Sequence, residues 1–297
     1  MNWIFIAISS HLVWAFGSIG DKFILTNKIK NPYIYCIWMF LIGGASVVLI
    51  PFFGLYIPTM SQFLWILLAT AFEFAALFPY VKAMQIEDVS RINILWVLIP
   101  LFSLIMAYFT IGETLTNNQI IAFCMLTFGI VLASMKFGKG IVKFSKAFWW
   151  MALSCVGFAI YGTAVRHVSQ EIGTINLFIY THIIGMLLAI PFFFFKKIRD
   201  IHAAEMKTFN TKTVLIILAA IVIGIIGTLL NVWALSLGKV ALVYAMEGFQ
   251  SIFVFILVIV FALFIKVDLR EDLDKRNVVL KICALLINLA GIALLNL

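Results

Sequence analysis

The sequence predicts an all-α membrane protein with ten transmembrane helices, arranged as two inverted five-helix repeats. Ten apolar stretches follow one another along the chain, and about 20 residues of helix are enough to cross the hydrocarbon core of a bilayer. The composition agrees, because 64% of the residues are hydrophobic, 11% are charged, and the mean hydropathy is +1.14. Stretches of this length without a two-residue alternation are not barrel strands, which leaves helices that satisfy their own backbone hydrogen bonds.

Nine short polar breaks separate the apolar stretches. The predicted spans, in chain order, are Trp3–Leu25, Tyr33–Leu55, Phe63–Met84, Val89–Ile111, Asn117–Met135, Ala147–Val165, Thr174–Phe195, Val214–Leu237, Val240–Ile265 and Asn277–Leu297. The first stretch has neither a basic n-region nor a small-residue cleavage site, so we interpret it as a retained helix. The long connection Lys196–Thr213 is interpreted as an interfacial helix.

The net charge of +8 follows the predicted topology and does not indicate a nucleic-acid partner. Nineteen of the 21 basic residues lie on odd-numbered connections, and only Arg166 and Lys239 lie on even ones. By the positive-inside rule the odd connections are cytoplasmic, so both termini are expected outside the cytosol, in a protein of the cell (inner) membrane. The four cysteines fall in four different spans without CxxC spacing and are interpreted as packing residues.

Three short patterns occur twice, in the same order and at the same places in a five-span unit. They pair Ile50-Pro51-Phe52-Phe53 with Ile190-Pro191-Phe192-Phe193, Ala83–Val89 with Ala234–Val240, and Gly129–Leu132 with Gly291–Leu294. Because five is odd, the two units cross the membrane with opposite orientation, an arrangement that in transporters places a site near the bilayer midplane. The units are residues 1–137 and 147–297, joined by a basic linker, residues 138–146.

The stretch from Ala83 through Ser90 and Pro100 to Gly112-Glu113-Thr114-Leu115-Thr116 and Gly129 resembles the EamA-like transporters of the drug/metabolite transporter superfamily. The second unit departs from the pattern, because Ser251 stands in place of the proline and 271–274 in place of the Gly-Glu motif. The resemblance covers essentially the whole chain. It implies that helices one to four and six to nine surround a central cavity, with five and ten at the periphery.

Glu73 and Glu247 are acidic residues that lie well inside the apolar spans. Such groups are costly in a membrane unless they are paired or hydrated, so we expect them to line a cavity. Their predicted role is proton coupling or the binding of a cationic group. The alternative is a protonated carboxyl that hydrogen-bonds a neighbouring helix.

A polar stripe runs along the first span at spacings of three, four and four residues, formed by His11, Trp14, Ser18 and Lys22. This stripe is expected to face the cavity, although Lys22 can equally extend to the membrane interface. The remaining candidates for the substrate or proton pathway are polar or aromatic: Tyr80, Arg91, Asn93, Trp96, Tyr161, His182, Asn231, Tyr244 and Gln250. Their structural alternatives are helix packing, interhelical hydrogen bonds and, for Arg91, an ion pair with Glu87.

The predicted function is therefore secondary transport of a small organic metabolite by alternating access, with proton coupling as an option. The alternative is a membrane-embedded lipid-handling protein or enzyme, which would need paired catalytic groups near one face. A receptor or scaffold would need an extramembrane domain. No ATP-binding, catalytic or metal-ligand motif is present in the sequence, so no cofactor, metal or catalytic residue is expected. The expected partners are the lipid bilayer and a small-molecule substrate, with a homodimer left open and no nucleic acid.

Overall fold

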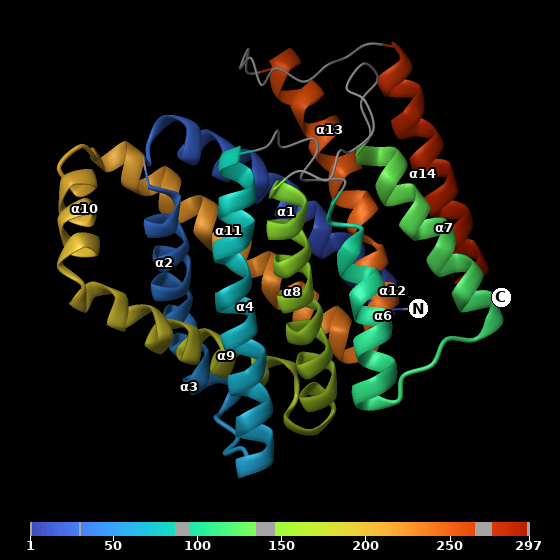
Figure 1. Cartoon of the computed structure of the whole chain (residues 1–297), viewed down its shortest axis with the longest axis horizontal. Helices are drawn as coiled ribbons and strands as arrows, with labels where there is room; N and C mark the ends of the chain where they lie inside the picture. Colours follow the sequence, from blue (N-terminus) through green and yellow to red (C-terminus); the bar gives the residue numbers. More distant parts are fainter. Residues whose placement is uncertain (1, 30, 87–94, 135–145, 265–274, 296–297) are drawn as a thin grey trace.

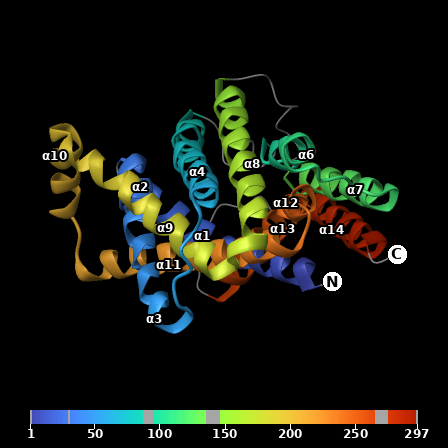
Figure 2. The same cartoon turned by 90° about the horizontal axis from the view of Figure 1, so that it is seen from below.

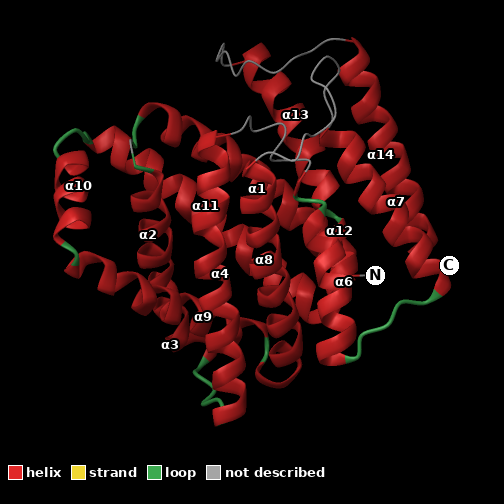
Figure 3. Cartoon of the chain, viewed as in Figure 1, coloured by secondary structure: helices red, strands yellow, loops and turns green. Residues whose placement is uncertain are grey.

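The computed structural model describes residues 2–29, 31–86, 95–134, 146–264 and 275–295, and this part of the chain is helical without any strand (Figures 1 and 3). Among these residues, eight helices are long and apolar enough to cross a membrane. Two shorter apolar helices, Leu98–Ile111 and Asn117–Leu132, lie within the fourth and fifth predicted spans. The chain is a multi-pass all-α membrane protein, and the count of ten crossings remains a prediction.

The elements, in chain order, are α1 (Asn2–Asn27), α2 (Pro32–Gly43), η1 (Gly44–Leu49), α3 (Ile50–Phe53), α4 (Met60–Ile86), α6 (Leu98–Ile111), α7 (Asn117–Ser134), α8 (Lys146–Ile172), α9 (Thr174–Ala189), η2 (Ile190–Phe194), α10 (Lys196–Met206), α11 (Thr211–Leu237), α12 (Val240–Ala245), α13 (Glu247–Phe264) and α14 (Lys275–Leu295). The predicted helix after Lys196 is confirmed as α10, whose place at the interface stays a prediction.

Reciprocal capping boxes fix where α4 and α7 begin. The Thr59 backbone N–H donates to Gln62 Oε1 over 2.8 Å, and the Gln62 N–H donates to Thr59 Oγ1 over 3.4 Å. Thr116 and Gln119 repeat this pattern at 3.0 and 3.4 Å. Each box satisfies two N–H groups that would otherwise lack a partner at a helix start.

The ninth predicted span is a candidate membrane span over Val240–Leu257, but it is interrupted at Met246, between α12 and α13. Around the break the hydrogen bonds run to the third residue back, from Met246 N–H to Val243 O and from Phe249 N–H to Met246 O. This tighter 3₁₀ pattern interrupts the α-helical ladder and makes Glu247 the first residue of α13.

Two further span boundaries differ from the prediction. The predicted span Val89–Ile111 is described as a helix only from Leu98, after a turn at Trp96 and Val97, while 87–94 lie outside the described residues. Helix α8 continues to Ile172, seven residues beyond the predicted end at Val165, so Arg166 lies in a helix instead of in a connection. Its donors reach backbone carbonyls of α11, which explains how a charged residue is accommodated there.

The irregular segments fall at corresponding places of the two predicted repeats. A 3₁₀ segment lies next to the first Ile-Pro-Phe-Phe copy, as η1, and coincides with the second, as η2. The turn at Trp96 corresponds to the break before Glu247 in the register set by Ala83 and Ala234. Interruption of the same spans at the same places is what a repeated architecture requires.

Helices from the two halves of the chain pack against one another. Helix α1 lies along α11, α4 along α8, α2 against α9, α6 against α12 and α7 along α14. Figures 1 and 2 show α7 and α14 together at one side of the molecule, far from α2 and α10. This peripheral position agrees with the expected place of the fifth and tenth helices, and Cys124 on α7 is exposed.

Both chain ends lie on one face, which we call the terminal face (Figures 1 and 2). Trp3 packs so closely on Gly238, at the connection from α11 to α12, that a Cβ on this glycine would lie 2.7 Å from the indole. Leu294 and Leu295 near the C-terminus lie beside the start of α7. The predicted ten crossings, an even number, would place both ends on one side of the membrane.

The charge bias predicts which side the terminal face occupies. A reporter inserted at Lys139, in the linker, should read as cytosolic, and a reporter at Leu297 as external, because positive connections are retained in the cytosol. Alkaline phosphatase and fluorescent-protein fusions at both positions measure this. The reverse pattern would show that the 19 basic residues on odd connections misassign the orientation.

Candidate functional site

A buried polar cluster joins α1 to the start of α13. His11 has no exposed surface, and its Nδ1 lies 3.5 Å from Glu247 Oε2 and 3.4 Å from Gln250 Oε1. Gln250 Nε2 donates in turn to Ser18 Oγ over 3.1 Å. In the tautomer that carries its hydrogen on Nδ1, this nitrogen can donate to either oxygen.

Local structure explains why these side chains meet. Glu247 and Gln250 are three residues apart in the first turns of α13, and His11 and Ser18 are seven residues apart on α1, so each pair shares one helix face. The break at Met246 leaves Glu247 at a helix start, where unpaired backbone N–H groups favour a carboxylate. The structure therefore brings four predicted site residues into one cluster.

Trp14 extends the cluster towards α11. Its ring lies edge-on to His11 at a centroid distance of 5.6 Å, and its Nε1 donates to the Gly224 carbonyl over 3.3 Å. The indole packs directly on Gly227, where a Cβ would lie 2.3 Å from Trp14 Cδ1. The missing side chain at Gly227 is what makes room for Trp14.

A second group of predicted residues lies where α8 meets α4, α6 and α12. Tyr244 donates its hydroxyl to the Phe158 carbonyl over 3.2 Å and packs on Gly162. The Trp96 ring centroid lies 5.0 Å from that of Tyr80 and 5.7 Å from that of Phe158. These contacts form an aromatic wall, of the kind on which an aromatic or cationic group can stack.

Tyr244 interacts electrostatically with both membrane carboxyls, Glu73 and Glu247. Tyr161 is within electrostatic range of Glu73 and Tyr244. Glu73 thus belongs to the aromatic side of the site and Glu247 to the histidine side, with Tyr244 linking them.

Three predicted site residues carry buried polar atoms without a hydrogen-bond partner among the described residues. These atoms are His11 Nε2, Tyr161 Oη and Asn231 Nδ2, and their side chains are 0, 4 and 2% exposed. An unsatisfied buried polar atom costs about 1–3 kcal/mol, so native proteins pair such atoms with water or ligand. The arrangement is suited to a polar solute or to ordered water.

Other predicted residues lie elsewhere or outside the described part. His182 on α9 bonds the Phe178 carbonyl through Nδ1 at 2.9 Å and packs on Gly43 of α2, so the structure does not bring it to the cluster. Lys22 lies in α1, but its side chain is not described, and Arg91, Asn93 and the Glu87–Arg91 pair lie in 87–94.

One polar pair within the helices was missed by the sequence analysis. Tyr35 on α2 donates its hydroxyl to Asp21 of α1, which holds this carboxyl inside the bundle. Asp21 follows Ser18 by three residues and Trp14 by seven, so it continues the predicted stripe. That spacing was the signal that could have found it.

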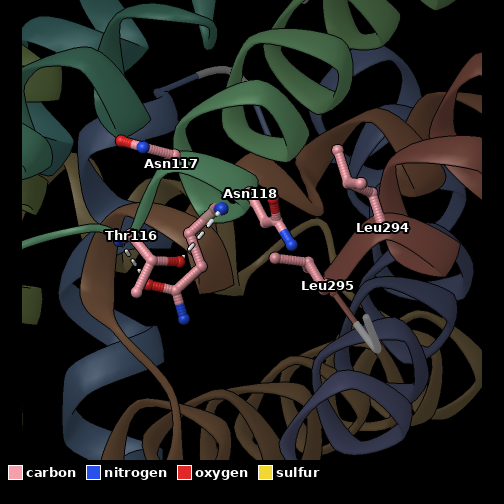
Figure 4. A pocket seen from close by; sticks show the side chains of 6 residues that line it. Thr116, Asn117, Asn118, Leu294 and Leu295 are labelled. Atoms are coloured by element: carbon pink, nitrogen blue, oxygen red, sulfur yellow. Dashed lines mark hydrogen bonds between the residues drawn. The ribbon is translucent and has the colours of Figure 1, made fainter.

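An open pocket of about 410 Å³ lies on the terminal face, away from the cluster, and is lined by Thr116, Asn117, Asn118, Gln119, Leu294 and Leu295 (Figure 4). Its lining holds no ionisable group, and the hydrogen bonds of its lining residues are those of the α7 capping box and the bond from Lys239 Nζ to Gln119 Oε1. We therefore assign it to the packing of α7 beside α14. Over the described ranges, no three of His, Cys, Asp and Glu gather as metal ligands would.

Residues 1–135 match the model of the EamA-like transporter family. This part of the chain is similar to the EamA-like family, and we call it the EamA-like unit. The resemblance read from Ala83 to Gly129 is thereby confirmed, and the match indicates a membrane transporter of small solutes. It ends before α8, so the EamA-like unit contains α1 to α7.

The fold of the whole chain is also found in solved structures. One crystal structure superposes with a TM-score of 0.67 over 98% of this chain and 93% of its own chain, at 16% sequence identity. The superposed fold includes the second half of the chain, which the family match does not reach. No curated protein matches the chain in sequence.

Proposed function

We propose that this chain is a secondary active transporter of a small organic metabolite, working by alternating access of two inverted five-helix units in the cell membrane. The carrying observation is the discontinuous helix at Met246, which places Glu247 beside the buried His11. In transporters with inverted repeats, broken helices supply the substrate and ion site near the midplane.

Helix packing supports the inverted repeat. In the predicted repeat, α1 corresponds to α8 and α4 corresponds to α11. When each helix is replaced by its counterpart in the other unit, the contact of α1 with α11 becomes the contact of α8 with α4. The contacts of α2 with α9, α6 with α12 and α7 with α14 each map onto themselves. A two-fold relation between the units explains all five contacts, and a rocking motion of one unit against the other then exposes the site to each side in turn.

The His11–Glu247 pair supports proton coupling. A carboxyl beside an imidazole offers two neighbouring sites for a proton, and the net charge of the pair changes by one each time a proton is bound or released. Tyr244 and Trp14 next to this pair provide apolar faces with a polar edge, which suits a small polar or amphipathic metabolite.

Purified protein in liposomes is expected to show saturable uptake or exchange of such a metabolite. Trp14→Ala, Asn231→Ala and Tyr244→Ala should each reduce uptake roughly tenfold, the effect of losing about 1.4 kcal/mol of binding. The matched control is Cys124→Ala on exposed α7, which should leave uptake unchanged. Flux of a panel of labelled amino acids, amines and organic acids, together with a thermal-shift screen of the same compounds, measures this.

Two outcomes would contradict the proposal. Absence of flux for every compound, combined with scrambling of fluorescent lipid between leaflets, would favour the lipid-handling alternative. Labelling that finds position 14 facing lipid and Cys124 open to water from both sides would place the route elsewhere.

A further inference from the structure

The loop between α6 and α7 meets the second half of the chain at the terminal face. This loop holds Gly112-Glu113-Thr114-Leu115-Thr116, and Gly112 has a positive φ of 66°, which turns the chain towards the connection between α11 and α12. The contacts made there join the EamA-like unit to α8, α11 and α12 through charged side chains.

Glu113 makes two of these contacts. Its Oε2 accepts the Val240 backbone N–H over 2.9 Å, at the first residue of α12, and its Oε1 lies 3.5 Å from Arg166 Nε. Val240 N–H has no partner within its own helix, so Glu113 satisfies a donor that would otherwise be unpaired. A carboxylate that bonds one backbone donor and one guanidinium is held in place from two sides.

Arg166 and Lys239 complete the set. Arg166 Nη1 donates to the Leu235 and Ser236 carbonyls at 3.2 and 2.6 Å, where α11 ends. Lys239 Nζ donates to the Thr114 carbonyl and, over 2.7 Å, to Gln119 Oε1. These two are the basic residues that the charge pattern left on the even connections.

We propose that Glu113, Arg166 and Lys239 form a latch that closes the transport route at the terminal face and has to break before the route opens there. Directly inside the latch lies Val243, one turn after Val240 on α12 and fully buried. The route beyond it leads to Tyr244 and Glu247 on the same discontinuous helix. The role in transport rests on the proposed function, whereas the closure itself can be measured without any substrate.

The latch also predicts a pH response with a defined sign. Burial raises the pKa of the Glu113 carboxyl above its ordinary value of 4.5, although the Val240 N–H, Arg166 and Lys239 act in the opposite direction. When the latch opens, Glu113 becomes solvated and regains an ordinary pKa. The closed form therefore binds the proton more tightly, so a fall in pH from above the raised pKa to 4.5 favours closure.

The test places a reporter cysteine at position 243, by Val243→Cys, with the exposed Cys124 and Cys283 changed to serine. A membrane-impermeant maleimide is applied to one face of sealed vesicles at a time, and labelling of position 243 is measured by mass spectrometry. Arg166→Ala and Glu113→Ala should each raise the labelling rate from the terminal face roughly tenfold, because each removes bonds to a charged group. Glu113→Gln, whose amide oxygen still accepts the Val240 N–H, should stay slow. Because the thiolate fraction alone changes maleimide labelling with pH, each rate is divided by that of a fully accessible cysteine, and this normalised rate should lose the pH dependence seen with Glu113.

The matched control is Glu171→Gln, at the same end of α8, whose carboxyl bonds Gln62 and not the latch. It should leave the labelling rate and its pH dependence unchanged. The latch is refuted if both alanine variants label as slowly as the parent while remaining monodisperse, or if they label equally fast from both faces. A normalised labelling rate that depends on pH in Glu113→Gln as it does in the parent refutes the role of this carboxyl. If the alanine variants label faster but the protein shows no flux, the latch is supported and only the transport function is refuted.

Discussion

Replacing Glu247 by glutamine should abolish most of the uptake and flatten its dependence on pH while leaving the protein folded. The carboxyl beside His11 can load and release a proton, and the amide that replaces it cannot, although it has the same shape and still accepts a hydrogen bond. Uptake into liposomes measured between about pH 5 and pH 8, the range in which histidine changes charge, tests this directly.

Two further variants are compared with Glu247→Gln. Glu73→Gln, on the aromatic side of the site, should have the same kind of effect but a smaller one, because Glu73 has no histidine beside it among the described residues. Asp200→Asn, an exposed carboxyl on α10, should leave the pH profile unchanged. If Glu247→Gln and Glu73→Gln both transport like the parent across this range, the two carboxyls are structural hydrogen bonders and proton coupling through them is excluded.

Adding one methyl group at Gly227 should reduce uptake about tenfold and lower the thermal stability. The new Cβ would lie 2.3 Å from Trp14 Cδ1 and 2.5 Å from Nε1, closer than atoms approach, so the indole has to leave its place beside His11. Overpacking of this kind costs about 1–3 kcal/mol in protein cores. Flux and the unfolding temperature in detergent measure the two effects.

The control for this variant lies three residues away on the same helix. A Cβ on Gly224 would meet nothing within 4 Å, and the Gly224 carbonyl that accepts the Trp14 N–H is retained in alanine. Gly224→Ala should therefore transport like the parent and be slightly more stable, since alanine is the better helix former. Equal effects of the two substitutions would show that helix propensity, and not the position of Trp14, governs this part of α11.

The helices were predictable because hydropathy over about 20 residues reports the cost of placing each residue in lipid, which is a property of the local sequence. The break at Met246 was not, because no proline lies there and the interruption follows from packing of α12 and α13 against other helices. The end of α8 was missed for the same reason. From the sequence, a charged residue such as Arg166 is expected in a connection. Its position inside α8 is explained only by the α11 carbonyls that accept its hydrogen bonds.

For the site, the depth of a charge in an apolar span was enough to single out His11 and Glu247. That they form one pair could not be read from the sequence, since 236 positions separate them and no local pattern says which helices are neighbours. His182 was selected by the same rule, but it lies on α9 and packs against α2. Depth in an apolar span alone therefore does not place a residue at a cavity. Glu113 was visible only as part of a family motif, because its partners lie in the other half of the chain.

The interleaving of the two halves has a consequence for how the protein is made. Helices α1 and α4 find their main packing partners, α11 and α8, only in the second half of the chain. During synthesis the first half is therefore already inserted while the surfaces that will contact α8 and α11 still face lipid. The family match ends at residue 135, whereas assembly has to wait until the second half has entered the membrane.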